Sequence, residues 1–142
     1  MRKYRWIVVL GIMAAVLLMP AAGVFAADIQ ELIDLYISDS EAAIPQLMML
    51  MDTEPETVTL VLAGVAEYVE NLDPADAERQ RLLGCVTQCC CDAAKISPAL
   101  AGQIVATMQL VAPDIATYVE ATLIAEGLEE KYLTEASPVA PK

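Results

Sequence analysis

The middle of the chain reads LLGCVTQCCCDAAK from Leu82 to Lys95, and this stretch holds all four cysteines of the 142 residues. The run DPAD, which starts at Asp73, has the polar and proline-containing composition of a helix start. Ser97-Pro98 offers the start of another helix directly after the stretch. The sequence therefore predicts one helix that starts near Asp73 and carries every cysteine before it ends at about Lys95.

Apolar residues on both sides of this stretch recur at spacings of three and four, the period of one helical face. They predict five further helices, over residues 28–38, 41–51, 53–72, 97–111 and 113–132. No segment alternates apolar and polar residues for long enough to form a strand. We therefore predict an all-α domain of about six helices over 27–133, followed by a disordered Pro/Ala tail over 134–142.

Polar residues mark where two of these helices are expected to begin. Ser40 is the expected cap of the second helix. Thr53 and Glu56 have the spacing of a capping box around Pro55, which would lie in the first turn of the third helix.

Two segments of the chain are similar to each other. Residues 60–70 and 110–120 agree at six of eleven positions, fifty residues apart, and predict two tandem three-helix units over 28–72 and 74–132. A proline-started helix, a turn and a second apolar helix resemble HEAT or armadillo repeats, over these paired helices only. The Arg and Asp positions usual between such helices are absent. The resemblance implies a helical-repeat stack or, because two repeats are fewer than the usual three, a compact bundle or a face open to a partner.

Residues 1–26 have the layout of a bacterial-type secretory signal peptide. Three basic residues open the segment, an apolar run follows over 6–19, and Val24-Phe25-Ala26 suits cleavage after Ala26. The apolar run is shorter than the roughly 20 residues that a membrane-spanning helix needs. We therefore expect export to the periplasm or the extracellular space without stable membrane insertion after cleavage, and a retained anchor is the alternative.

The composition argues against several classes of function. All 20 acidic residues and five of the eight basic ones follow residue 26, and the whole chain has a formal net charge of −12. Such an acidic chain is a poor partner for nucleic acid or an anionic membrane surface. The sequence has no histidine, which is the usual general base and the commonest metal ligand, and no Gly-rich phosphate loop. We therefore expect neither an enzyme nor a bound cofactor.

A helical wheel at about 100° per residue separates the four cysteines. Cys85, Cys89 and Cys90 fall on or beside the apolar arc of the predicted helix, whereas Cys91 falls with Thr87 on the polar side. Free cysteine often packs as a small hydrophobic residue, so the first three are expected to face inward. Cys91 is the expected reactive thiol, because a thiol must meet solvent to react.

Two other roles for the cysteines stay open. Export would place them in an oxidising compartment, but the geometry of a bridge within one helix is poor, so an intermolecular disulfide through Cys91 is the more natural oxidised product. Alternatively, the thiolates of Cys85, Cys89, Cys90 and Cys91 could bind zinc or copper(I). These thiols point to different sides of a helix, so metal binding would need a second chain or a distorted helix, and we expect no metal site.

Together these features favour an exported, non-enzymatic, all-α protein that acts by binding another protein or by self-association. The alternative is a thiol-based copper- or zinc-binding protein.

Overall fold

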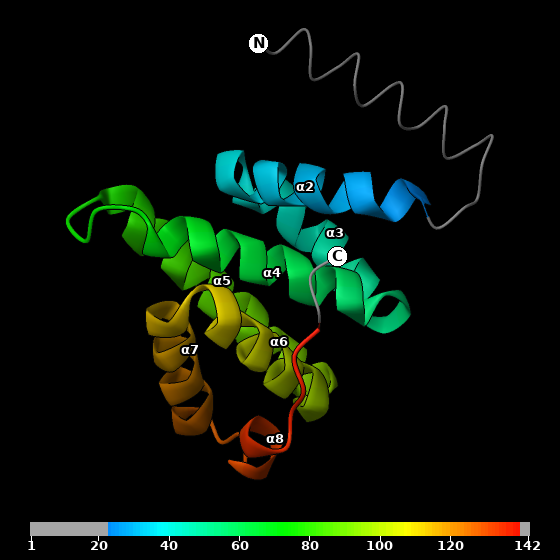
Figure 1. Ribbon diagram of the computed structural model, residues 1–142, viewed down its shortest axis with the longest axis vertical. Coiled ribbons are helices and arrows are strands. Elements are labelled where there is room, and N and C mark those ends of the chain that lie inside the picture. Colours follow the sequence, from blue (N-terminus) through cyan, green and yellow to red (C-terminus); the bar gives the residue numbers. More distant parts are fainter. Residues whose placement is uncertain (1–22, 140–142) are drawn as a thin grey trace, which may run out of the picture.

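The computed structural model describes residues 23–139, and within that range the chain forms seven helices and no strand (Figure 1). The prediction of an all-α fold is confirmed. Most of the expected signal peptide, residues 1–22, lies outside the described residues, and so do residues 140–142. The helices are α2 (Gly23–Ser38), α3 (Ser40–Thr53), α4 (Pro55–Glu70), α5 (Ala77–Ile96), α6 (Pro98–Val111), α7 (Pro113–Ala125) and α8 (Lys131–Thr134).

Single extended residues separate most neighbouring helices. Glu54, Ser97 and Ala112 have φ between −140° and −152°, and each is followed by a proline at the first helical position. A proline disfavours the helical region for the residue before it, so it forces the chain to turn there and starts a new helix. Asp39 has the same extended conformation without a proline, and its carboxylate accepts a hydrogen bond from Ala42 N at 3.3 Å.

The positions of these junctions define two three-helix units, α2–α4 and α5–α7. Junctions at 39 and 97 are 58 residues apart, as are those at 54 and 112. Within each unit the two junctions, at 39 and 54 or at 97 and 112, enclose a helix of 14 residues. Two side-chain hydrogen bonds repeat at the same offset. Gln30 Nε2 donates to Asp34 and Gln88 Nε2 to Asp92, both at 3.1 Å; Thr59 and Thr117 donate to the carbonyls of Pro55 and Pro113, both at 2.9 Å.

This offset corrects the alignment expected from the sequence. The similarity of residues 60–70 to 110–120 has an offset of fifty, and it pairs the second half of α4 with the end of α6 and the first half of α7. Both segments carry an apolar face of the same period, so they look alike although their helix ends do not correspond. The backbone junctions place the two units 58 residues apart.

Helix α4 lies at the centre and contacts every helix from α2 to α7 (Figure 1). Its valines explain this position, because Val58, Val61, Val65 and Val69 are all fully buried. Contacts between α4 and α6 join the two units into one core. In an open repeat stack each unit would contact only its neighbour through one face, whereas here five helices surround one, as in a bundle.

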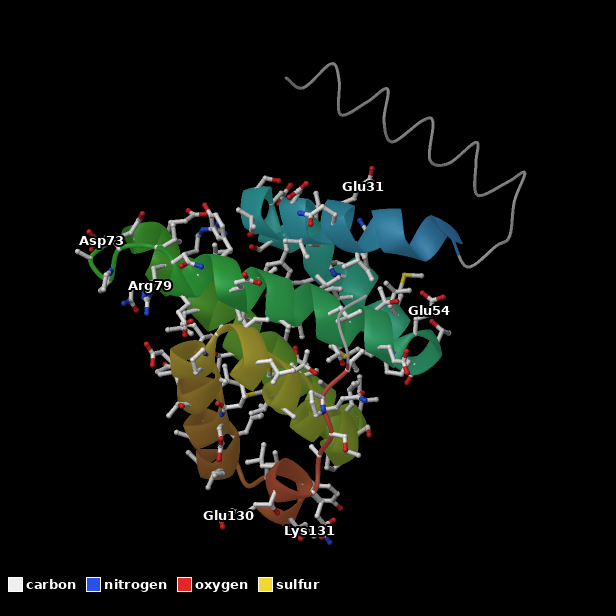
Figure 2. The ribbon with its side chains drawn as sticks, viewed as in Figure 1. Glu31, Glu54, Asp73, Arg79, Glu130 and Lys131 are labelled. Atoms are coloured by element: carbon white, nitrogen blue, oxygen red, sulfur yellow. The ribbon has the colours of Figure 1, made fainter. Side chains whose placement is uncertain are left out.

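Arginine closes the turn between the two units. Arg79 Nη1 donates hydrogen bonds to the carbonyls of Val69, Glu70 and Leu72 at 2.9–3.0 Å, near the end of α4. Figure 2 shows Arg79 next to the turn that carries Asp73. The last carbonyls of a helix lack partners within the helix. The Arg79 guanidinium donates to two of them in α4, those of Val69 and Glu70, and to Leu72 O just beyond the helix.

Two expected helix starts differ in the structure. Ser40 is not the cap of α3, because Asp39 occupies that position and the buried Ser40 hydroxyl donates to Tyr36 O at 2.6 Å. The expected capping box is also wrong. Thr53 is the last residue of α3, and Glu54 caps α4 without a side-chain hydrogen bond.

The C-terminal segment also differs from the expectation. The sixth helix was expected to continue to residue 132, but α7 ends at Ala125 because Gly127 adopts a φ of +106°, a conformation that favours glycine. The chain then forms the short α8 and continues to Val139, whose N–H donates to Thr107 Oγ1 on α6 at 2.9 Å. The described part of the expected disordered tail thus lies against the domain.

Candidate functional site

Helix α5 distributes the four thiols between the core and its edge. Cys89 and Cys90 are 1% and 0% exposed, whereas Cys85 and Cys91 are both half-buried. The expectation that Cys85 packs inward with the other two therefore does not hold in full. Thr87, expected on the polar side, is buried, because its hydroxyl donates to Leu83 O at 2.7 Å and leaves the methyl group to pack.

Cys89 has a buried partner on another helix. Its Sγ lies 3.3 Å from the hydroxyl of Tyr36 on α2, and either atom could be the donor. Burial raises the pKa of the Cys89 thiol to about 11, against a smaller opposing effect of this hydrogen bond. Burial, with the neighbouring Cys89 as the next cause, also raises the pKa of Tyr36. Both groups are therefore neutral at physiological pH and unsuited to act as nucleophile or base.

The two half-buried thiols face different surroundings. Cys85 lies within electrostatic range of Tyr36 and Arg81, on the side of α5 that faces the end of α2. Cys91 lies near Glu126, at the end of α7; burial raises its pKa, and the negative charge of Glu126 adds to this effect. Within residues 23–139 no three Cys, Asp or Glu side chains gather into a group that could hold a metal ion.

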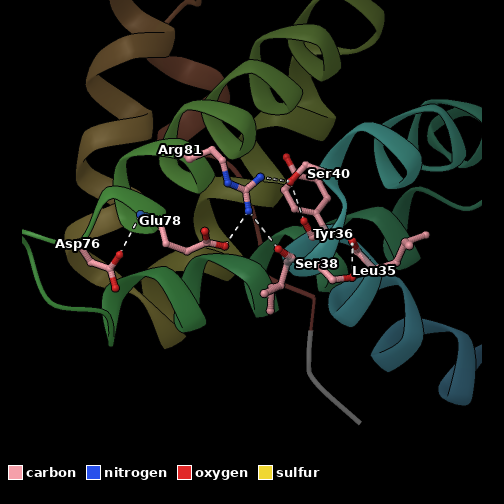
Figure 3. Close-up of polar contacts among 8 residues, drawn as sticks. Leu35, Tyr36, Ser38, Ser40, Asp76, Glu78 and Arg81 are labelled. Carbon is pink, nitrogen blue, oxygen red and sulfur yellow. Dashed lines mark hydrogen bonds and ion pairs between the residues drawn. The ribbon is translucent and has the colours of Figure 1, made fainter. Parts of the chain in front are cut away.

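Arg81 fastens α5 to the junction between α2 and α3. Its guanidinium donates to Ser40 Oγ at 3.2 Å and Ile37 O at 3.1 Å, and it pairs with Glu78 at 2.7 Å (Figure 3). The pair is exposed, so its ionic part contributes little. The geometry nevertheless fixes α2 against α5, beside the contact between Tyr36 and Cys89.

A cleft of about 570 Å³ opens between α2 and α4. Gly64 forms part of its wall on α4, and a methyl group at this position would run into the side chain of Ile33 on α2. The absent side chain therefore leaves room for the end of the Ile33 side chain between the two helices. Nine residues line the cleft: Gln30, Ile33, Asp34, Ile37, Ser38, Gly64, Glu67, Tyr68 and Asn71.

The chemistry of this α2–α4 cleft is mixed. Ile33 and Ile37, one helical turn apart, supply apolar surface, and Tyr68 is 39% exposed. Asp34 and Glu67 place one carboxylate on each helix, and no Lys or Arg lines the cleft. The amides are engaged locally, with Gln30 donating to Asp34 and Asn71 donating to Glu67 O at 2.9 Å. The cleft thus offers apolar contacts beside unneutralised negative charge.

The corresponding positions of the second unit carry different residues. At the offset of 58, Ile33 corresponds to Cys91, Ile37 to Lys95, Gly64 to Thr122 and Tyr68 to Glu126. The second unit therefore lacks the glycine, the tyrosine and both isoleucines. The combination of apolar and acidic side chains at these positions therefore occurs in the first unit alone, although both units have the same arrangement of helices and junctions.

The sequence analysis did not find this cleft. Its lining residues are spread over α2 and α4 and have the spacing of ordinary amphipathic helices. The available signal is Gly64, a glycine inside an otherwise apolar helix, which often marks close approach of another element. No candidate thiol lines the cleft.

A scan against known protein families gives no match for this chain, and searches of curated proteins and of solved structures give no significant match.

No helix within residues 23–139 is long and apolar enough to cross a lipid bilayer.

Proposed function

We propose that this protein is an exported, non-enzymatic helical protein that acts by binding another protein, with the α2–α4 cleft as its docking surface. The observation that carries the proposal is the cleft itself, where apolar side chains, an exposed tyrosine and two carboxylates meet on one face. Tyrosine at such a position is typical of protein interfaces, because its ring buries apolar area while its hydroxyl stays wet.

Two features favour binding over catalysis. The chain has no histidine to serve as a general base near neutral pH. The thiols of Cys89 and Cys90 are buried, and burial raises the pKa of each, which disfavours the thiolate that a nucleophile needs.

A thiol-based metal site would have to recruit thiols from a second chain, because one helix turns Cys85 and Cys91 toward different neighbours.

Site-specific photo-crosslinking in the native host tests the proposal. A benzophenone amino acid replaces Tyr68 in the cleft or, as the matched control, Tyr118 on α7, which is also exposed but lies outside the cleft. We expect a discrete cross-linked protein from position 68 and none from position 118. A product of twice the mass would identify a second copy as the partner. Equal products from both positions, or none from position 68, would contradict the proposal.

A further inference from the structure

We infer that the α2–α4 cleft takes a short amphipathic helical segment of a partner protein, with aliphatic side chains at a spacing of three and four and Lys or Arg between them. This inference rests on the proposed function and specifies the chemistry of the partner. It follows from the charge, the apolar surface and the shape of the cleft, taken in turn.

The charge of the cleft calls for a cationic ligand. Asp34 on α2 and Glu67 on α4 both line it, and within the described residues neither forms an ion pair. The described ion pairs join Arg81 to Glu78 and Lys131 to Glu129; the Arg81 guanidinium reaches the edge of the cleft at Ile37 O, but its charge is paired with Glu78. Opposite charge across an interface guides association and selects the partner, so a basic segment is favoured and an acidic one is rejected.

The apolar surface of the cleft favours a ligand that carries apolar side chains as well as positive charge. Ile33 and Ile37 lie one turn apart on α2, and the ring of Tyr68 stands on α4. Such a pair of aliphatic side chains matches apolar residues spaced three or four apart on a docked helix. A simple polyvalent cation would leave this apolar area in water and would gain nothing from it.

The size and composition of the cleft fit a segment better than a small apolar molecule. A volume of about 570 Å³ has room for a few side chains. Two of the lining residues, Asp34 and Glu67, are charged, and a buried apolar ligand would take water from their carboxylates without supplying a cation. The cleft lies between two packed helices, which is the arrangement of helix-in-groove recognition.

The rival explanation is unspecific attraction, because any basic peptide is attracted to a chain with net charge −12.

Three fluorescent peptides of about 14 residues, long enough to present a helical face, distinguish specific binding in the cleft from unspecific attraction. The first has Leu at helical spacing of three and four with Lys between, the second is a permutation that destroys this spacing, and the third has Glu in place of Lys. Anisotropy measures their binding to the purified protein at about 0.15 M salt, where long-range attraction is screened.

Two double variants separate the cleft from the overall charge. Asp34→Asn with Glu67→Gln removes the two cleft carboxylates, and Asp52→Asn with Glu126→Gln removes two exposed carboxylates outside the cleft. We expect the first peptide to bind the unchanged protein more tightly than the permutation. We also expect its affinity to fall by about tenfold in the cleft variant, and to change little in the control variant. Circular dichroism checks that both variants remain folded.

Each other outcome overturns the inference in a recognisable way. Equal binding of the permuted peptide, or an equal loss in the control variant, would leave only unspecific attraction. Preferential binding of the Glu peptide, or failure of the Lys/Leu peptide to bind, would exclude a basic segment. In those cases a product at position 68 in the crosslinking experiment would still support a docking role, and its absence would remove the proposed function as well.

Discussion

The hydroxyl of Tyr36 and the Sγ of Cys89 lie 3.3 Å apart in the core, and they join residues 53 positions apart in the chain. Tyr36 is the largest side chain among the fully buried residues. Its hydroxyl would otherwise be a polar group without a partner, which is costly in the core. The cysteine on α5 therefore fixes where α2 packs, and its role in the fold is structural.

This contact should be measurable as a coupling energy. We expect Tyr36→Phe and Cys89→Ala, combined in a double-mutant cycle, to show an interaction of about 0.5–1.5 kcal/mol in the free energy of unfolding. Cys89→Ser should be milder than Cys89→Ala, because a serine hydroxyl can still bond to Tyr36. Urea denaturation of the unchanged protein, the three variants of the cycle and Cys89→Ser gives the values. Additive effects of the two substitutions would mean that the contact contributes nothing to stability.

Alkaline pH should destabilise the fold through the buried thiols. Burial raises the pKa of Cys89 to about 11 and that of Cys90 well above its usual value, whereas a thiol in the unfolded chain titrates near 8.5. The unfolded state therefore loses these protons first. The stability due to the protonated thiols is complete below about pH 8.5 and declines as pH rises toward 11, by up to about 1.4 kcal/mol per pH unit for each thiol.

The double variant Cys89→Ala with Cys90→Ala is the control for this effect. Its unfolding free energy is expected to be lower at neutral pH, because two small cavities form. Its decline between pH 8.5 and 11, followed by urea denaturation at several pH values, should be shallower than that of the unchanged protein. An identical slope would assign the alkaline sensitivity to other groups.

Local chemistry explains which parts of the fold the sequence could predict. Pro55, Pro98 and Pro113 each begin a helix, because a proline acts on its immediate neighbour and needs no tertiary context. The end of α7 was missed because apolar residues continue beyond Gly127, and only the backbone shows that this glycine has a positive φ. Ser40 was misassigned because its hydroxyl is taken by the preceding turn and by Arg81, from α5.

The candidate site was harder to predict, because it depends on the distance between helices. The cleft exists where Ile33 on α2 meets Gly64 on α4, and no local pattern reports that meeting. The wheel placed Cys89 and Cys90 correctly within the core, since helical periodicity alone decides this. It could not place Cys85, whose exposure depends on how closely α5 approaches the end of α2.

Thiol labelling should now distinguish two pairs of cysteines. A maleimide reagent at pH 7 should modify Cys85 and Cys91 in the folded protein, because both are half-buried, and should reach Cys89 and Cys90 only after denaturation. Cys85→Ser and Cys91→Ser should each remove one fast label, as read by mass spectrometry. Labelling of all four thiols in the native state would contradict their burial. Protection of all four that disappears on adding a chelator would instead indicate a bound metal.

Gly102 should be essential for the position of the C-terminal segment. It is buried in α6, and a methyl group there would collide with the backbone carbonyl of Tyr132, which cannot move aside as a flexible side chain can. We expect Gly102→Ala to push residues 132–139 off α6 and to break the hydrogen bond from Val139 N to Thr107 Oγ1. Hydrogen exchange should then become fast at Val139.

Gly84 on α5 provides the matched control, because a methyl group there meets no atom within 4 Å. Alanine is favoured over glycine inside a helix by roughly 0.5–1 kcal/mol, so Gly84→Ala should raise the free energy of unfolding by about that amount. Gly102→Ala gains the same helix propensity but loses the packing of the C-terminal segment, and we expect a net decrease. Urea denaturation of both variants compares them directly, and equal stabilisation would show that the segment does not pack on α6 in solution.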